Sequence, residues 1–212
     1  YGSRLSPHSY RIELIFQYLH CQYQYVDINI TKKQSRTAQF LALNRLGEVP
    51  VLIADDSTIF DSAAVAEYLY STLPCGSSLI PDSSFELAIH SFWVALEAGT
   101  HKEFKPLLDE FQYPKNSKNT PPFDELYRSH IHSRAMQKLQ LLECRLADLK
   151  YIMGDQISYA DFVWYSRIKF MQKTSMTNSI SALNAIGCWL SRIDDILLKI
   201  PDPRMEREFG HE

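Results

Sequence analysis

Residues 49–73, VPVLIADDSTIFDSAAVAEYLYSTL, contain two β-type segments and a helical segment in immediate succession. Residues 49–53 form a compact apolar run, and residues 54–57 are rich in turn formers. Residues 58–60 return as a second strand, and residues 62–73 carry apolar side chains at helical spacing. The stretch therefore predicts a β-hairpin followed by a helix.

The residues before this stretch alternate in the same way between helix-like and strand-like segments. In residues 9–19 the apolar side chains fall at positions i, i+3, i+4 and i+7, which is one face of a helix. Residues 23–30 are enriched in β-favouring side chains, and a short helix around Phe40 and Leu43 should end before Gly47. This order predicts one α/β domain with a mixed sheet. Its first strand would begin ahead of Tyr1.

The second part of the chain has a different character. Residues 74–84 are rich in Pro, Gly and Ser and are typical of a linker. Beyond them no strand is expected, and a break is predicted at 113–122. The expected domains are an α/β domain at 1–73, a linker at 74–84 and an all-helical domain at 85–212. The helical segments predicted in the last of these are 85–99, 124–150, 158–173 and 183–199.

Composition excludes several classes of function. The formal net charge is −3 and no basic block follows one face, so neither nucleic acid nor an anionic membrane is an expected partner. No apolar run reaches the roughly 18–20 residues of a membrane span. The four cysteines are scattered, which favours free thiols over a disulfide framework or a zinc site. We expect a cytoplasmic protein without a bound metal.

The segment Ser6-Pro7-His8-Ser9 is the sharpest candidate for chemistry, since it should start the first helix. A helix N-terminus offers unpaired N–H groups and positive potential, both of which favour an anion. A serine hydroxyl there can donate a hydrogen bond to a thiolate and lower the pKa of the thiol. The alternative is that Ser6 and Ser9 are simply helix caps.

Two further segments could complete a binding site. Pro50 stands at the entrance of an apolar strand, and a cis Val49-Pro50 bond would turn the Val49 backbone toward a ligand. Asp61-Ser62 precedes the next helix, where a carboxylate suits an amino group and free amides suit a carboxylate. That pair fits the amino-acid end of a peptide, although N-capping alone would also explain it. Farther on, Ser158 and Asp161 are spaced as a capping box with a structural role.

Taken together and in order, these segments resemble the cytosolic glutathione transferase superfamily. The resemblance runs from end to end, and the ordered set is far more specific than any one motif. The second domain contributes residues 79–81, LIP, residues 153–161, MGDQISYAD, and residues 188–193, CWLSRI. The blocks of the first domain are residues 1–3, YGS, residues 6–11, SPHSYR, residues 40–52, FLALNRLGEVPVL, and residues 60–69, FDSAAVAEYL.

The resemblance implies a thioredoxin-like N-terminal domain, an all-α C-terminal domain and glutathione as co-substrate. It places Ser6 at the thiol-activating position of the serine-type classes, with the class itself unassigned. It implies that Val49 pairs its backbone with the cysteinyl part of glutathione beside cis-Pro50. Asp61 and Ser62 would hold the γ-glutamyl end, with aspartate where relatives more often carry glutamate or glutamine.

One departure concerns the glycyl end of glutathione. Glu48 stands where many relatives carry lysine or glutamine, and two nearby carboxylates would repel each other. Arg36 matches a basic position in some serine-type classes and could supply the missing charge. We therefore expect Arg36 to bind the glycyl carboxylate, and Glu48 to point to solvent or to a nearby base.

The expected activity is transfer of the glutathione thiolate to an electrophilic, apolar small molecule in a detoxifying homodimer. Leu5, His8 and Phe104 are the candidates for the electrophile pocket, although core packing is the simpler role for Phe104. Peroxidase or isomerase side activity stays open, as does a non-catalytic module that binds glutathione or a protein partner. Thiol–disulfide exchange at this helix start is not expected, because serine replaces the required cysteine.

Overall fold

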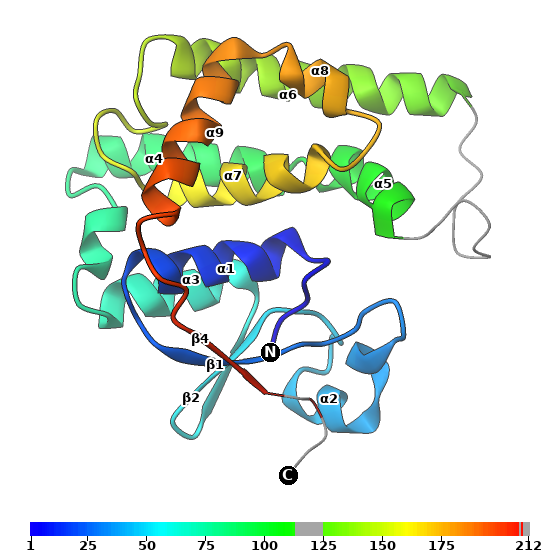
Figure 1. Ribbon diagram of the computed structural model, residues 1–212, viewed down its shortest axis with the longest axis vertical. Coiled ribbons are helices and arrows are strands. Elements are labelled where there is room, and N and C mark those ends of the chain that lie inside the picture. The colour runs from blue at the N-terminus through cyan, green and yellow to red at the C-terminus, as the bar shows by residue number, and fades with distance from the viewer. Residues whose placement is uncertain (113–124, 208, 210–212) are drawn as a thin grey trace. The chain divides into compact units, whose positions relative to one another are not determined.

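The computed structural model describes residues 1–112, 125–207 and 209, and it groups them into two compact units. Unit 1 consists of residues 1–80 and 196–212, and unit 2 of residues 81–195. The sequence analysis assigned all of 85–212 to the helical domain, whereas the contacts group the C-terminal segment with unit 1. The fold is that of an α/β N-terminal domain followed by a mainly helical domain (Figure 1).

Unit 1 has the order of elements that the sequence predicts. The predicted hairpin is present as two antiparallel strands in which Val51 faces Phe60, and the helix after it is α3. Two short 3-10 helices, η1 (Gln34–Arg36) and η2 (Gly76–Leu79), were not expected. The other elements are α1 (Pro7–Tyr18), β1 (Tyr23–Val26), α2 (Ala38–Leu43), β2 (Val51–Ala54), β3 (Ser57–Phe60) and α3 (Ser62–Thr72).

Tyr1 and Gly2 join the hairpin to β1. The Gly2 N–H donates to the Val26 carbonyl at 3.0 Å, and the Ile28 N–H donates to the Gly2 carbonyl at 2.7 Å. Tyr1 exchanges two hydrogen bonds of 2.9 Å with Val51. The first two residues therefore connect the β1–β4 pair to the β2–β3 pair. Unit 1 contains an apolar cluster of Val26, Ile28, Phe40 and Val51. Tyr1 packs against this cluster.

A strand near the C-terminus was missed by the sequence analysis. β4 (Arg204–Arg207) pairs parallel with β1, with Tyr23 opposite Arg204. Three of its four residues are charged and neither face is apolar, so no local pattern predicts a strand. Long-range contacts hold the strand instead: Arg204 Nη1 donates to Glu13 Oε2 at 2.8 Å, and Arg4 pairs with Glu206.

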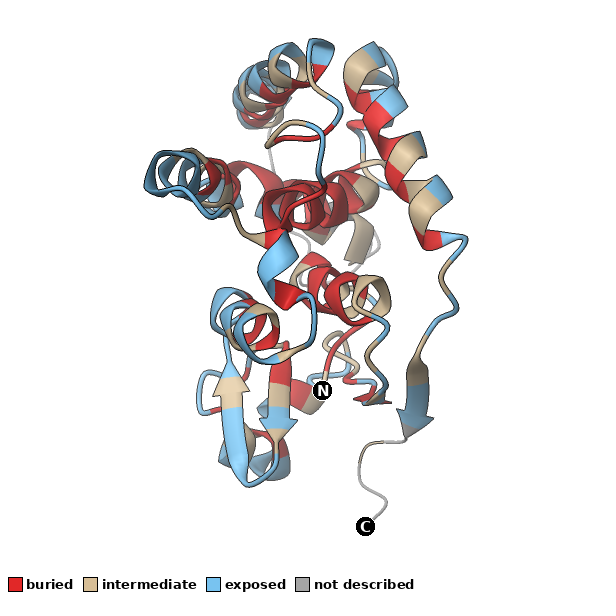
Figure 2. Ribbon diagram, turned by 90° about the vertical axis from the view of Figure 1, so that its left-hand side faces the viewer, coloured by how far each residue is buried: buried red, intermediate tan, exposed pale blue. Residues whose placement is uncertain are grey.

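Unit 2 is helical throughout the part that the structure describes. α7 (Tyr159–Met171) is buried on nearly every side (Figure 2). The Arg167–Glu97 ion pair is buried with it. The predicted helices are present, α5 and α8 were not predicted, and the predicted break at 113–122 lies outside the described residues. The remaining helices are α4 (Ser84–Ala98), α5 (His101–Gln112), α6 (Glu125–Ala147), α8 (Thr177–Ser181) and α9 (Asn184–Leu197).

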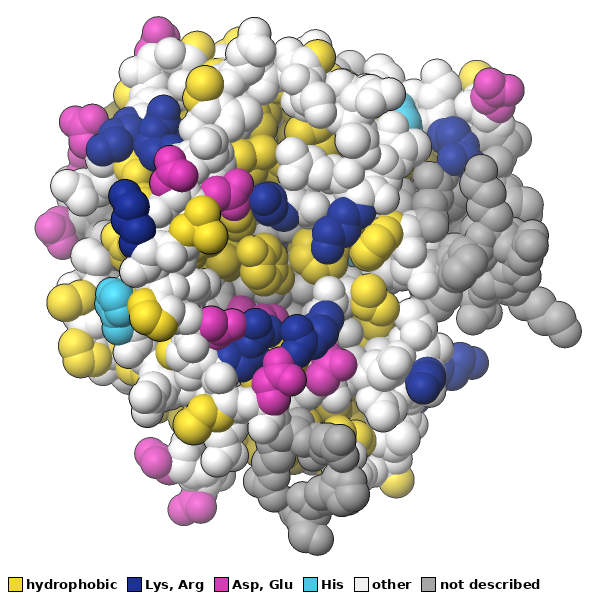
Figure 3. All heavy atoms as spheres, in the orientation of Figure 1, with side chains coloured by type: hydrophobic (Ala, Val, Ile, Leu, Met, Phe, Trp, Pro, Cys, Tyr) yellow, Lys and Arg dark blue, Asp and Glu magenta, His cyan; other side chains and the backbone are white. Residues whose placement is uncertain are grey.

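The capping box predicted at the start of α7 is present. The Asp161 carboxylate accepts the Ser158 N–H at 2.9 Å and also the Ser158 hydroxyl at 2.8 Å. The surface charges are of both signs and interspersed on the face seen in Figure 3. Within the described ranges, every helix is too short or too polar to cross a bilayer.

Candidate active site

The candidate site begins at Ser6, which is the N-cap of α1. Its backbone is extended, and its Oγ accepts the Ser9 N–H at 3.2 Å. Pro7 follows at the first helical position, where its missing N–H costs nothing. A hydroxyl also carries one hydrogen, and among the described residues nothing accepts the Ser6 hydrogen. Ser6 therefore keeps a free donor at the positive end of a helix.

The two neighbouring serines hold Ser6 in place. The Ser9 Oγ accepts the Ser3 N–H at 3.0 Å, and the Ser6 N–H donates to the Ser3 carbonyl at 2.9 Å. Ser3 and Ser9 are both buried. The Ser6 and Ser9 hydroxyls each accept one backbone N–H, and Ser6 differs by its position as the N-cap of α1. The alternative that both serines are helix caps holds for Ser6, which is the N-cap of α1, whereas Ser9 accepts the N–H of Ser3.

The Val49-Pro50 peptide bond is cis. In the part of the chain that the structure describes, the Val49 N–H and C=O have no hydrogen-bond partner. Pro50 is buried and Val49 is half-buried, directly ahead of β2. Buried or half-buried backbone groups are normally paired, so those of Val49 are available to an extended peptide ligand.

Asp61 is the N-cap of α3 and has a positive φ of 74°. Its Oδ1 accepts the Ala63 N–H at 2.8 Å and the Ala64 N–H at 3.4 Å. Asp61 itself therefore accepts hydrogen bonds from two of the amides that were candidates for binding a ligand carboxylate. Among the described residues, nothing donates to the second Asp61 carboxylate oxygen or accepts the Ser62 N–H. Strained backbone of this kind is concentrated at functional sites.

A contact that the sequence analysis missed brings the two helix starts together. The His8 Nδ1 lies 3.2 Å from the Ser62 Oγ, across 54 residues of sequence. The contact joins the first turn of α1 to the first residue of α3, so Ser6 and Ser62 belong to one region of unit 1. His8 is half-buried rather than fully solvent-facing. No local pattern would reveal this pair, since it depends on how α1 packs on α3.

Arg36 ends η1 ahead of α2, and Glu48 follows the turn after α2. The Arg36 Nη1 donates to the Leu46 carbonyl at 2.8 Å. Gly47 has a φ of 65°, and a Cβ built there would lie 2.6 Å from the Arg36 Nη1. Arg36 therefore packs on the turn that leads to Val49-Pro50, and within the described ranges its other N–H groups have no acceptor. The Glu48 side chain is exposed, as expected.

The three candidates for the electrophile pocket have different positions. Leu5 is half-buried beside Ser6, and His8 contacts Ser62. Phe104 is fully buried in unit 2, and the Arg167 guanidinium lies 5.8 Å from its ring centroid. A ring without exposed surface cannot line an open pocket, so Phe104 is corrected to a core residue. The described residues contain no acidic, His or Cys cluster suited to a metal.

The chain is similar to known proteins along most of its length. Residues 1–71 match the glutathione S-transferase N-terminal domain, and residues 110–196 match its C-terminal domain. A glutathione S-transferase from Hyoscyamus muticus is 22% identical over 91% of both chains.

Two solved structures share the fold. Glutathione transferase F7 from Populus trichocarpa has a TM-score of 0.80 at 20% identity, covering 96% of this chain and 97% of that one. A glutathione transferase from Burkholderia graminis, solved with two glutathione molecules per subunit, has a TM-score of 0.77 at 19% identity. That match covers 92% of this chain and 85% of the other. With both domain models matched in order and the helix starts arranged as described, the chain belongs to the glutathione transferase superfamily.

Proposed function

We propose that this protein conjugates glutathione to electrophilic, apolar small molecules and that Ser6 stabilises the glutathione thiolate. The observation that carries the proposal is the free hydroxyl hydrogen of Ser6 at the N-terminus of α1. Relatives along nearly the whole chain are glutathione S-transferases, and one structural neighbour holds glutathione. Both support glutathione as the co-substrate.

The electrostatics of the α1 start favour an ionised sulfur. A free thiol has a pKa near 8.5, so it is a few per cent ionised at neutral pH. A lowering of about two units would make the thiolate the main form at pH 7, which requires about 2.7 kcal/mol of differential stabilisation. A charge-assisted hydrogen bond contributes about 1.5–3 kcal/mol, and a helix N-terminus adds about 0.3–1 kcal/mol. These two contributions are sufficient.

The rest of glutathione would form hydrogen bonds with polar groups around Ser6. The Val49 N–H and C=O would pair with the cysteinyl backbone, as one more strand pairs with a sheet edge. The second Asp61 oxygen would accept the α-amino group, and the Ser62 N–H and hydroxyl would bind the α-carboxylate. Arg36 would bind the glycyl carboxylate and offset the exposed Glu48. Leu5 and His8 stay our candidates for contact with the electrophile.

In the proposed reaction the sulfur lone pair forms a C–S bond to the electrophilic carbon. With an aryl halide the halide leaves with the bonding electrons. With an activated alkene the electrons move to the neighbouring carbon, which takes a proton from water. The hydroxyl of Ser6 stays protonated throughout and acts as a donor. We further propose a cytoplasmic homodimer with a detoxifying role, which sedimentation and cell fractionation would check.

Calorimetry with glutathione and S-methylglutathione, followed by an assay with a generic aryl halide, tests the proposal. We expect glutathione to bind more tightly than the methylated analogue, which cannot ionise, and we expect turnover of the halide. Binding without turnover would favour the non-catalytic module, for which the short acid at Asp61 and the exposed Glu48 are the supporting features. Absence of binding would refute both.

A further inference from the structure

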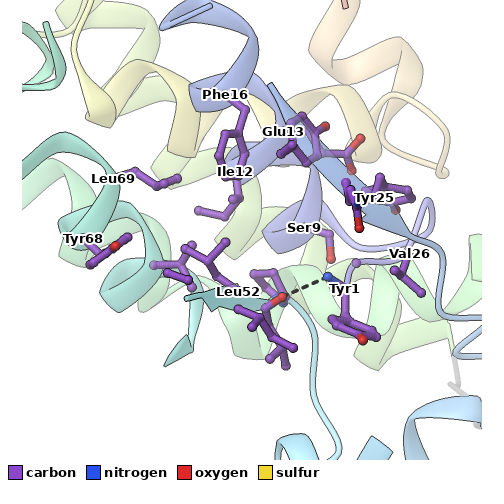
Figure 4. A pocket seen from close by; sticks show the side chains of 18 of the residues that line it. Tyr1, Ser9, Ile12, Glu13, Phe16, Tyr25, Val26, Leu52, Tyr68 and Leu69 are labelled. Carbon is purple, nitrogen blue, oxygen red and sulfur yellow. Dashed lines mark hydrogen bonds between the residues drawn. The ribbon is translucent and has the colours of Figure 1, made fainter. Parts of the chain in front are cut away.

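The imidazole of His8 and the hydroxyl of Ser62 meet where α1 packs on α3. Ile12 on α1 and Leu69 on α3 are buried, and both line one pocket next to this helix pair (Figure 4). His8 lies in the first turn of α1, Ser62 is the first residue of α3, and the His8 Nδ1 is 3.2 Å from the Ser62 Oγ. The packing of the two helices therefore sets the distance between these two polar groups.

Ser62 is the residue that can still donate hydrogen bonds at the start of α3. Asp61 accepts the N–H groups of Ala63 and Ala64, so these two amides are not available to a ligand. Within the described residues, the Ser62 N–H has no acceptor and the Ser62 hydroxyl contacts His8 alone. A carboxylate bound at this positive helix end would therefore depend on the N–H and the hydroxyl of Ser62.

The direction of the hydrogen bond between His8 and Ser62 decides what the hydroxyl can offer a ligand. A hydroxyl has one hydrogen, and a neutral imidazole has one nitrogen that donates and one that accepts. If the Ser62 hydroxyl donates to Nδ1, its hydrogen is used and only lone pairs face the ligand. If the Nδ1–H donates to the Ser62 Oγ, the hydroxyl hydrogen stays available. A carboxylate only accepts, so the hydroxyl can bind it only in the second arrangement.

We propose that His8 is a positioning residue for the γ-glutamyl end of glutathione. Its Nδ1–H donates to the Ser62 Oγ, and the Ser62 hydroxyl in turn donates to the α-carboxylate. The distance of 3.2 Å suits an N–H···O bond, and two hydrogen bonds in series strengthen each other. This role rests on the proposed function, because it takes glutathione as the ligand at Ser62. His8 thereby contributes to the selection of ligands that carry an α-carboxylate.

Two substitutions of the same shape test the donor of His8. Asparagine carries its NH₂ group on Cγ, where histidine carries Nδ1, so His8→Asn keeps a donor at this position. Leucine branches in the same way and has no donor. We expect His8→Leu to raise the dissociation constant for glutathione about 10-fold, and His8→Asn to stay within about threefold of the wild type. In steady-state kinetics the loss should appear in KM for glutathione rather than in kcat.

A ligand without the α-carboxylate shows whether the effect passes through Ser62. γ-Aminobutyryl-cysteinylglycine is glutathione without this group, and calorimetry should give it equal affinities for the wild type and for His8→Leu. The double variant of Ser62→Ala with His8→Leu should bind glutathione no more weakly than Ser62→Ala alone. Thermal melting of each variant checks that it is folded.

Nitrogen NMR of the histidine-labelled wild type provides a measurement on the unaltered site. It distinguishes a ring nitrogen that carries a hydrogen from one that does not. The spectrum of His8→Asn identifies the signals of His8 among the seven histidines. We expect a hydrogen on Nδ1 when glutathione is bound. An Nδ1 without a hydrogen in this complex would overturn the proposal.

The outcomes separate the role of His8 from the proposed function. Equal losses of glutathione affinity in His8→Leu and His8→Asn, or the same loss for the ligand without the α-carboxylate, would overturn the role of His8 alone. A loss confined to KM for the electrophile would place His8 in the electrophile pocket and also overturn it. Absence of glutathione binding to the wild type would refute the proposed function together with this role.

Discussion

The N-cap residues of α1 and α7 are both serines, and the two serines use their hydroxyl groups differently. At the start of α7 both the N–H and the hydroxyl of Ser158 donate to Asp161, which also accepts from Ile152 and from the Trp189 indole at 2.9 Å. At the start of α1 Ser6 accepts one bond and keeps a free hydrogen in the described structure. A saturated cap, whose hydrogen-bonding groups are all paired, stabilises the fold. A cap with an unpaired donor can bind a ligand.

We expect the largest effect, a loss of folding stability, from a change that disrupts the saturated cap of α7. Asp161→Asn replaces one acceptor oxygen with an NH₂ group. Whichever way the amide turns, this group faces at least one N–H donor that cannot accept, either that of Ser158 or those of Ile152 and Trp189. Because Asp161 has no exposed surface, we expect a loss of about 3–5 kcal/mol in the free energy of unfolding. Urea denaturation measures this loss. An effect below about 1 kcal/mol would show that the cap is not the anchor of α7.

The second prediction concerns the unsaturated cap. Ser6→Ala should lower kcat/KM for conjugation about 100-fold, comparable to removal of one preorganised donor from an oxyanion site. The variant should lose about 0.5–2 kcal/mol of stability through the Ser9 N–H. Ser158→Ala is the matched control, which should lose stability while its activity per folded molecule stays unchanged. Equal activity losses in both variants would contradict the comparison.

The third prediction concerns pH and the neighbourhood of α7. His90 is buried with its ring 6.3 Å from that of Tyr159, and burial lowers its pKa to about 4. Between pH 6.5 and about 4 the unfolded chain therefore binds a proton that the folded chain does not. Folding stability should fall by about 2 kcal/mol as the pH drops through this range.

His90→Phe should remove this contribution. The measurement is the free energy of unfolding across the same pH range for both proteins, because their difference cancels all other titrations. If the two curves are parallel, His90 is not the group responsible.

The smallest effect is expected at Arg36, which is exposed and also bound to the Leu46 carbonyl. Arg36→Ala should weaken glutathione binding severalfold, with high salt reducing the difference. Arg36→Lys should retain part of the affinity, because it keeps the charge. Calorimetry gives the dissociation constants, and an unchanged value for Arg36→Ala would reject the role at the glycyl carboxylate.

The sequence was sufficient wherever short-range patterns determine structure. The β2–β3 hairpin, α3 and the capping box at Ser158 were predicted from local residue order, and the cis bond before Pro50 was implied by the family resemblance. Tertiary contacts determine what was missed. β4 depends on Arg204 reaching Glu13 over 191 residues, and α5 contains Pro106, which obscures its helical pattern. The contact of His8 with Ser62 requires that α1 packs on α3.

The central claim is that the free hydroxyl of Ser6 keeps the bound glutathione sulfur ionised. Ultraviolet difference absorbance of the thiolate, titrated with pH for glutathione bound to the wild-type protein and to Ser6→Ala, measures this directly. We predict a bound-thiol pKa about two units below that of free glutathione in the wild type, and a return most of the way to the free value in the variant. Identical titration curves for the two proteins would contradict the account.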